Sequence, residues 1–318
     1  MTRAVETWER FWFRDVETSS LALLRIAFAV VVLAWTISLA PALYSFFGDD
    51  GILPSHPDGD AGSWGLLQLD SGSAAVTALY LLLLVAALSL LVGFKTRLAA
   101  VVVFVCLVSF ARRDPWVLNS GDLLVVVLAF YLMLAPSGAA LSVDRWLEAR
   151  RRFWEFPQRS LWPLRLIQVQ VSLLYLFAVW GKVRGETWND GTAVSYAFRI
   201  EDLERFPVPG FVMDSLLLVN LMTFGTLAVE LALAILVWNG KLRPWVLLLG
   251  VLLHLGIDYA VRVGFFSYAA LVAYIAFVPP ETVSAWIHRL RDRMARSRLA
   301  WLVPSVEPAE PVEPEGRP

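Results

Sequence analysis

The sequence predicts an all-α integral membrane protein, built as a polytopic bundle of about eight transmembrane helices. Of its 318 residues, 58% are hydrophobic and only 17% are charged, and the mean hydropathy of +0.62 lies far outside the range of ordinary soluble proteins. Apolar runs long enough to cross a bilayer also recur along most of the chain. The net charge of −1 provides no basic field for nucleic acid, so the expected partner is the lipid bilayer.

The expected spans are apolar runs separated by polar turns: residues 21–40, 74–93, 98–111, 123–135, 164–181, 216–238, 245–261 and 264–278. The third and fourth runs are short for lipid-facing spans, so we expect a hairpin whose tip, residues 111–122, is buried in protein. Ala40-Pro41-Ala42 resembles a signal-peptidase site. The apolar run before it is too long for a signal peptide and contains Arg25, so we expect a retained helix.

Lysine and arginine in the short loops predict the orientation. They concentrate at the N-terminus, in the turns at 93–97, 136–163 and 239–244, and near the C-terminus, which places both termini in the cytoplasm. The loops at 41–73 and 182–214 then face outward. Arg112 and Arg113 break this bias, and a buried hairpin tip would explain them.

Four segments organise the chain. Residues 1–19 are polar and aromatic and are expected to lie at the membrane interface. The transmembrane domain covers 20–280. Residues 281–302 place arginines opposite apolar side chains, which predicts an amphipathic basic helix on anionic lipid. Residues 303–318 are acidic and proline-rich and are expected to be disordered.

Cysteine and histidine give no support for a metal centre. Cys106 is the single cysteine, and His56, His254 and His288 lie far apart without zinc-type spacing. No metal site is therefore expected.

Lys182 stands where an apolar run gives way to a polar loop that contains Trp188. A lysine kept dry at a membrane boundary can lose its proton and act as a base. The alternative is a lysine that extends to the lipid headgroups.

Other ionisable groups fall within the expected spans, where each needs a partner or a cavity. Glu230 is too deep to reach water easily, so we expect a buried, partnered acid. Arg25 is either such a partner or a side chain that reaches the near surface. Asn119 and Asp122 either contribute to a site or form the N-terminal cap of the helix that follows.

His254 and Asp258 are four residues apart and therefore share a helix face, where a carboxylate can orient an imidazole. A core histidine would show the same spacing. The aromatic side chains that follow, including Phe266 and Tyr268, are expected either to wall a flat ring ligand or to form plain core.

The order of several segments resembles the vitamin K-dependent γ-carboxylase family, whose bacterial relatives are called HTTM proteins. The segment with Tyr175, Lys182, Trp188 and Gly191 is similar to the lysine segment of that family. Further similar segments are SLALLRIAFA at 20–29, ALSLLVGFKTRLA at 87–99, WVLNSGDLL at 116–124, ALSVDRWL at 140–147, VELALAILVW at 229–238 and LLHLGIDYAVRVGFFSYAAL at 252–271. The similarity is collinear over about residues 18–280.

Two departures limit what the resemblance implies. Ser120 stands where the animal enzymes have a histidine, and the large extracytoplasmic region of those enzymes has no counterpart after Pro279. We therefore do not expect carboxylation of protein glutamates. The animal enzymes carry two adjacent lysines, and Lys182 matches one or the other depending on the counting.

The resemblance implies an enzyme that couples oxygenation of a reduced quinone, of the vitamin K or menaquinol type, to deprotonation or carboxylation of an unknown peptide or small-molecule acceptor. The implied co-substrates are O₂ and CO₂. Lys182 would be the base, with His254 and Asn119 as further catalytic groups. Quinone contacts are assigned to Trp188, Tyr196, Phe266 and Tyr268, and buried charge partners to Arg25, Asp122, Glu230 and Asp258.

The resemblance also implies a multi-pass protein of the bacterial cytoplasmic membrane with an outward-facing site. A function of a different class stays open, namely a non-enzymatic membrane protein for export or maturation of a secreted peptide, or for immunity to it. Under that hypothesis, the polar groups only join helices to one another.

Overall fold

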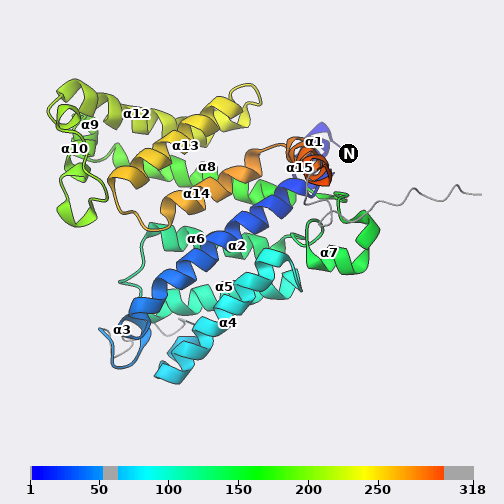
Figure 1. The fold of residues 1–318 in the computed structure, drawn as a ribbon. Helices are drawn as coiled ribbons and strands as arrows, with labels where there is room; N and C mark the ends of the chain where they lie inside the picture. The colour runs from blue at the N-terminus through cyan, green and yellow to red at the C-terminus, as the bar shows by residue number, and fades with distance from the viewer. Residues whose placement is uncertain (1, 53–63, 297–318) are drawn as a thin grey trace, which may run out of the picture.

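The computed structural model describes residues 2–52 and 64–296. Its long helices lie side by side in one bundle (Figure 1). They are α2 (Ser19–Leu39), α4 (Ser73–Val92), α5 (Thr96–Arg113), α6 (Ser120–Leu134), α8 (Trp162–Lys182), α12 (Leu216–Ile235), α13 (Arg243–Ala260) and α14 (Phe266–Tyr274).

Shorter elements gather at the two ends of this bundle (Figure 1). One end, here the α15 end, carries α1 (Arg3–Phe13), α7 (Val143–Glu148), α15 (Pro280–Ala295) and an antiparallel pair of strands, β1 (Asp15–Glu17) and β2 (Gln158–Ser160). The other, the α10 end, carries α3 (Leu43–Phe47), α9 (Glu186–Asn189), α10 (Ala193–Phe198) and α11 (Gly210–Met213). Single 3₁₀ turns occur at Ala40–Ala42, Leu66–Gln68, Arg150–Arg152, Glu201–Leu203, Leu236–Trp238 and Ile275–Phe277.

The helical membrane class predicted from composition is confirmed. Among the described residues, five helices are long and apolar enough to cross a membrane, or six if α14 and α15 count as one bent span. The five are Ser19–Phe47, Ser73–Val92, Trp162–Lys182, Leu216–Trp238 and Arg243–Ala260. The expected number of eight is not reached by length and composition, because α6 has only 15 residues, α14 has only 9, and the 18 residues of α5 include Arg97, Arg112 and Arg113.

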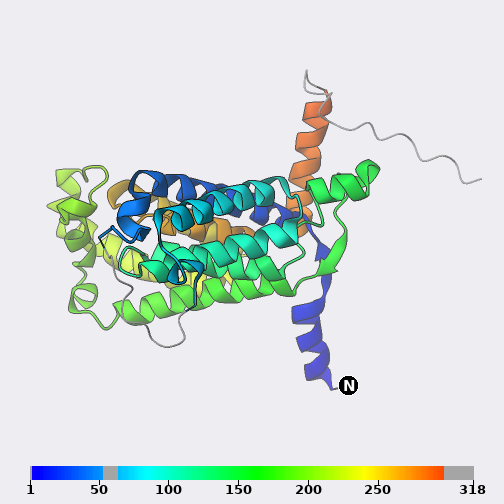
Figure 2. The same cartoon turned by 90° about the horizontal axis from the view of Figure 1, so that it is seen from below.

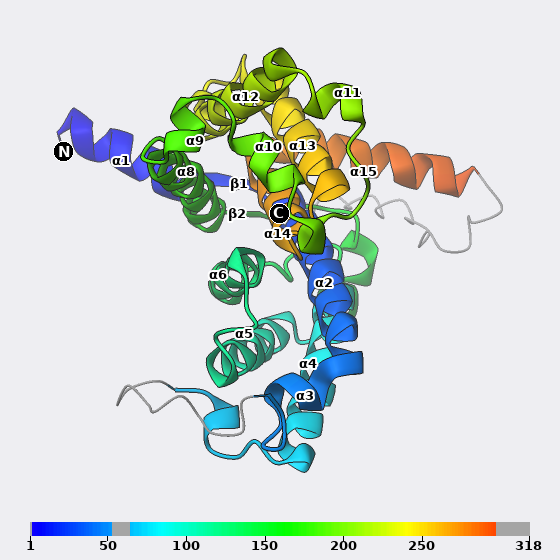
Figure 3. The same cartoon turned by 90° about the vertical axis from the view of Figure 1, so that its left-hand side faces the viewer.

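Seen along the bundle, the helices fall into two groups (Figure 3). Helices α8, α12 and α13 form one group and α4, α5 and α6 the other, with α2 and α14 between them. Side chains such as Leu24, Phe28 and Phe277 are buried where the groups meet. Many outward side chains on α4 and α13 are large and apolar, as expected for surfaces that contact lipid.

The tip of the α5–α6 hairpin is buried only in part. Arg113 is fully buried and its Nη2 donates to the carbonyl oxygen of Gly48 at 3.1 Å, with Asp49 at 3.9 Å. Arg112, by contrast, is exposed. The buried tip therefore explains Arg113, and the same explanation for Arg112 is wrong.

Two helices leave the bundle sideways at the α15 end. Figure 2 shows α1 and α15 extending in opposite directions across the bundle axis. The chain bends by 101° between the α14 segment and α15, at Pro279 and Pro280. Helix α15 covers Pro280–Ala295 of the amphipathic segment expected at 281–302. The remainder of that segment and the acidic tail lie outside the described residues.

Arg25 is fully buried near the α15 end. Its guanidinium donates to the carbonyl oxygens of Ser137 at 2.9 Å, Ala140 at 3.4 Å and Leu141 at 2.6 Å. Gly93 has a φ of +74°, and a Cβ there would lie 2.8 Å from Arg25 Nη1. Arg25 is therefore buried, and its hydrogen-bond partners are backbone carbonyl groups instead of a charged side chain.

Candidate functional site: a buried polar cluster

Lys182 and Glu230 form an ion pair between α8 and α12. Lys182 Nζ lies 2.5 Å from Glu230 Oε1 and 2.6 Å from Oε2. The Glu230 side chain is 7% exposed, whereas that of Lys182 is 24% exposed. Glu230 is thus the buried, partnered acid expected from its depth. A charge-assisted contact of this kind is strong because little water competes for it.

A chain of hydroxyl groups and an imidazole lies beside this pair. The hydroxyl of Tyr175 on α8 contacts the Tyr274 hydroxyl on α14 at 2.5 Å and His254 Nε2 on α13 at 2.7 Å. His254 Nδ1 lies 3.4 Å from the Ser267 hydroxyl. All four side chains are buried, so their polar atoms depend on one another for hydrogen bonds.

The ion pair and this chain form one electrostatic unit. Glu230 interacts with the hydroxyls of Tyr175 and Tyr274, and Lys182 interacts with His254. Tyr175 precedes Lys182 by seven residues, which places both on one face of α8. We call these six residues the polar cluster: Tyr175, Lys182, Glu230, His254, Ser267 and Tyr274.

The loop after α8 holds an aromatic ring against Lys182. Lys182 Nζ lies 5.2 Å from the centre of the Trp188 ring, a cation–π contact. Gly191 has a φ of +80°, and its carbonyl oxygen accepts a hydrogen bond from Asn220 Nδ2 on α12 at 2.9 Å. This turn ties the Trp188 loop to the helix that carries Glu230.

His254 and Asp258 do not pair, which corrects the expectation that this carboxylate orients the imidazole. Asp258 Oδ2 accepts hydrogen bonds from Arg205 at 2.8 Å and from Tyr268 at 2.9 Å. The imidazole is oriented by Tyr175 and Ser267 instead. Four-residue spacing places two side chains on one face, but each takes the nearest partner from the elements packed around it.

Asn119 and Asp122 form the N-terminal cap of α6. Asn119 Oδ1 accepts from the backbone N–H of Gly121 at 2.7 Å, and Asp122 Oδ2 accepts from the N–H of Asn119 at 2.9 Å. Asp122 Oδ1 also accepts from the Trp35 indole at 2.7 Å. The capping alternative is confirmed. The cap packs against the loop before α14, since a Cβ on Gly264 would lie 2.6 Å from Asn119 Nδ2.

The aromatic residues assigned to quinone contacts do not all lie together. Phe266 contacts His254, with ring centres 5.6 Å apart, and Trp188 contacts Lys182. Tyr196 on α10 and Tyr268 are exposed at the α10 end. The polar cluster therefore has Trp188 and Phe266 as its aromatic neighbours.

Sequence reasoning missed Tyr274 as a partner of the cluster. Its position offers no signal in isolation, because it lies in an apolar stretch and its partner Tyr175 is 99 residues away. Tyr175 was noted only as the start of a motif. The seven-residue spacing to Lys182 was the signal that could have identified it.

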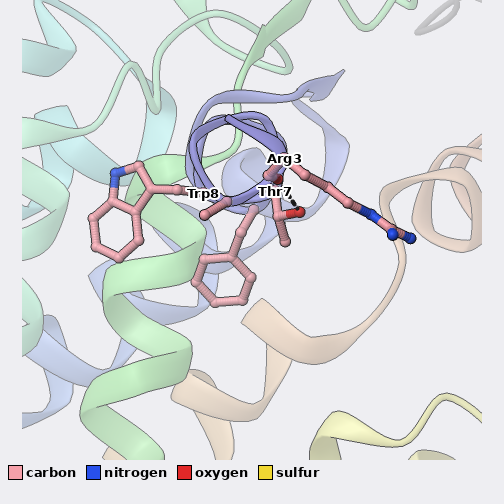
Figure 4. Close-up of a pocket in the computed structure, with 5 residues that line it drawn as sticks. Arg3, Thr7 and Trp8 are labelled. Atoms are coloured by element: carbon pink, nitrogen blue, oxygen red, sulfur yellow. Dashed lines mark hydrogen bonds between the residues drawn. The ribbon is translucent and has the colours of Figure 1, made fainter. Parts of the chain in front are cut away.

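A hollow on α1 lies away from this cluster. Figure 4 shows Arg3, Thr7 and Trp8 around it, with the Thr7 hydroxyl donating to the Arg3 carbonyl at 2.8 Å. Helix α1 has no buried residues and contacts the bundle through Phe11, whose carbonyl oxygen accepts from Arg165 on α8 at 3.0 Å, so the hollow lies on an outer face of the molecule. Within residues 2–52 and 64–296, no group of three His, Cys, Asp or Glu side chains converges as a metal site would require.

Comparison with known protein families identifies the family of this chain. The family model of the HTTM domain matches residues 13–282. The chain belongs to the HTTM family. HTTM proteins are membrane proteins of the vitamin K-dependent carboxylase type. No curated protein and no solved structure matches this HTTM chain.

Proposed function

We propose that this HTTM protein is a quinol-dependent enzyme of the carboxylase type, with the polar cluster as its proton-handling site. The observation that carries the proposal is the pair of Lys182 and Glu230, whose charges act on a buried hydroxyl chain nearby between the long apolar helices. Ionisable groups are rare at such depth and mark proton or substrate sites more often than plain packing.

The pair as a unit can accept one proton. A lysine and a carboxylate in contact hold one proton fewer than their capacity, whichever of the two atoms carries it. Lys182 is neutral when that proton lies on Glu230, and this arrangement provides the base that deprotonates a hydroquinone. The pairing modifies the sequence-based hypothesis, because Lys182 depends on Glu230 for its proton-accepting form.

The hydroxyl chain supplies a route for the accepted proton. Tyr175 contacts both Tyr274 and His254, and His254 continues to Ser267. Each hydroxyl can donate one hydrogen bond while it accepts another, so a proton can move along such a chain without large rearrangement. His254 therefore acts in the proposal as a relay, without a carboxylate partner.

The surroundings of Lys182 suit a flat, apolar substrate. The Lys182 side chain is the more exposed member of the pair, and the Trp188 ring lies against it. Phe177 and Trp180, earlier on α8, are exposed large apolar side chains that a lipid-soluble molecule would meet first. A reduced quinone of the vitamin K or menaquinol type fits these features, with O₂ and CO₂ as co-substrates and an unidentified peptide or small molecule as acceptor. Asn119, Tyr196 and Tyr268 remain candidates for contacts at the α10 end.

Quinol-dependent oxygen consumption by the purified protein tests this function. Lys182→Arg keeps the positive charge, but a guanidinium does not lose its proton and so cannot act as a base, and turnover should fall about 100-fold or more. Glu230→Gln should lower it similarly. A small exogenous amine should restore part of the rate in Lys182→Ala. Lys241→Arg, an exposed lysine at the turn between α12 and α13, is the matched control and should keep full turnover.

Full turnover by Lys182→Arg would overturn the role of Lys182 as a base. Full turnover by Glu230→Gln, with Lys182→Arg inactive, would show that Lys182 acts without its partner. If wild-type protein consumes no oxygen with any quinol and Glu230→Leu is destabilised, the cluster only joins helices, as the non-enzymatic alternative requires.

We further propose that the chain crosses a bacterial cytoplasmic membrane eight times, with the α15 end in the cytoplasm and the polar cluster nearer the outer face. The basic turns at 93–97 and 239–244 share the α15 end with α1 and α15, which supports this orientation. Impermeant thiol labelling, with Cys106 replaced, should modify a cysteine at Glu201 and spare one at Glu148. The reverse pattern would invert the orientation.

A further inference from the structure

A second pocket lies at the α15 end, remote from the polar cluster. It has a volume of about 310 Å³ and opens between the start of α5, the turn after α6 and strand β2. Its wall includes Arg97, Leu134, Ser137, Asp144 and Arg159. These residues come from segments far apart in the sequence, so the pocket is a product of the fold.

Two guanidinium groups give the pocket a positive wall. Arg97 and Arg159 are both exposed, and within the described part of the chain neither forms an ion pair. Arg159 Nη1 donates to the carbonyl oxygen of Gln158, which leaves its other nitrogens available. Arginine forks match the geometry of phosphate oxygens.

Asp144 is the acidic residue of the wall, but its charge is already engaged. Its carboxylate accepts hydrogen bonds from the backbone N–H groups of Lys95 at 2.7 Å and Thr96 at 2.8 Å, and from the Thr96 hydroxyl at 2.7 Å. Buried Arg25 also attracts it. The pocket wall therefore has two arginine side chains that form no ion pair among the described residues. Its one carboxylate is already hydrogen-bonded to Lys95 and Thr96.

Ser137 is a buried residue of the pocket wall. The residue is 2% exposed, and its Oγ has no hydrogen-bond partner among the described residues. Its backbone is held in place, since its carbonyl oxygen accepts from Arg25. This carbonyl contact fixes the turn after α6 that forms one side of the pocket.

The rest of the wall is apolar, and its position fits the edge of a bilayer. Leu134, Ala135, Pro136 and Ala139 line it, and Leu134 is 40% exposed. Arg159 lies opposite Val16 in the β1–β2 pair, so the strand that follows α1 fixes this arginine. A ligand with a phosphate at one end and acyl chains at the other matches both halves of the wall.

We propose that this pocket binds the phosphate of one phospholipid headgroup, with Arg97 and Arg159 as donors and the apolar wall against the start of the acyl chains. The site is independent of the proton chemistry proposed for the polar cluster. It makes a single lipid part of the structure at the α15 end.

Native mass spectrometry of the delipidated, full-length protein, titrated with short-chain phosphatidylglycerol, tests the proposal. Wild type should retain one lipid. Arg97→Gln/Arg159→Gln should weaken that binding about ten-fold or more, because each lost charge-assisted hydrogen bond is worth about that factor. The control Arg289→Gln/Arg293→Gln removes the same charge from exposed positions on α15 and should bind as wild type does.

Ala139→Leu fills the pocket while it keeps every charge, and it should also weaken binding about ten-fold by steric exclusion. This variant decides the matter if the arginine double variant does not fold. Unchanged binding in Ala139→Leu, or equal binding of a diacylglycerol with the same chains, would overturn the phosphate site. If inorganic phosphate binds as tightly as the lipid, the pocket takes a free anion and the lipid assignment is wrong.

Discussion

Arg25 and Lys182 are both cations of long apolar helices, Arg25 within α2 and Lys182 at the end of α8, and their partners differ in kind. Arg25 is fully buried and donates to three fixed backbone carbonyls, none of which can take its proton. Lys182 keeps partial exposure and contacts a carboxylate that can. The first arrangement immobilises a charge, whereas the second leaves a proton free to move. Burial of a charge therefore does not by itself identify chemistry; the nature of its partner does.

The largest expected effect comes from Arg25. Arg25→Met removes the donor from three carbonyl groups, which should lower the free energy of unfolding by about 3 kcal/mol or more. Thermal unfolding and size-exclusion chromatography in detergent would measure the loss. Arg293→Met, an exposed arginine on α15, is the control and should change little. If Arg25→Met folds as stably as wild type, Arg25 is not needed to hold the fold, and the proposed contrast with Lys182 fails.

The ion pair should show coupling that Arg25 cannot. Lys182→Met and Glu230→Leu each leave one charge unpaired and should destabilise by about 2 kcal/mol, reduced from the fully buried case by the exposure of Lys182. The double variant should lose less than the sum of the two. Thermal unfolding of the four proteins completes the cycle. Additive losses would mean that the contact contributes nothing.

The hydroxyl chain should contribute less to stability. Tyr175→Phe removes the hydroxyl shared by Tyr274 and His254, and we expect a loss of about 1 kcal/mol in the free energy of unfolding. Tyr44→Phe is a matched control, because its exposed hydroxyl contacts only Thr77. If Tyr175 relays protons, Tyr175→Phe should lower turnover even under conditions in which the variant is fully folded. Unchanged turnover of the folded variant would assign Tyr175 to packing.

The smallest effect concerns Asp144, beside Arg25. Desolvation raises the pKa of Asp144, but hydrogen bonds from Thr96 and Lys95, with the charge of Arg25, outweigh it, so the pKa lies below its usual value. The carboxylate therefore stabilises the fold above about pH 4 and ceases to do so as pH falls through the lowered folded pKa. Asp144→Asn should weaken the dependence of the unfolding temperature on pH between pH 6 and 3. An unchanged slope would contradict this.

Local patterns in the sequence predicted the features that depend on one helix alone. The membrane class followed from apolar runs, the cap at Asn119 and Asp122 from its residue types, and the burial of Glu230 from its depth. Partners across helices could not be predicted in the same way. Lys182 and Glu230 are 48 residues apart, and Asp258 pairs with Arg205 instead of His254. Both pairings depend on how the helices pack, which the sequence does not display.

The number of spans shows the same limit. Helix α6 has only 15 residues and α5 carries three arginines, so a test of length and charge passes over both, although each packs against neighbouring helices. Hydropathy measures how a segment meets lipid. A helix sheltered by its neighbours is therefore undercounted, and impermeant labelling decides whether it crosses.

The sideways departure of α1 and α15 has a mechanical consequence. If α1 and α15 lie along one membrane surface, as the proposed orientation requires, these two helices fix how deeply that end of the protein sits in the bilayer. A thicker or thinner bilayer must then be accommodated at the far end, where α8 finishes at Lys182. We expect the degree to which Lys182 meets water to follow acyl-chain length, and reaction of its amine with a water-soluble acylating reagent, compared across bilayers of increasing thickness, would measure that dependence.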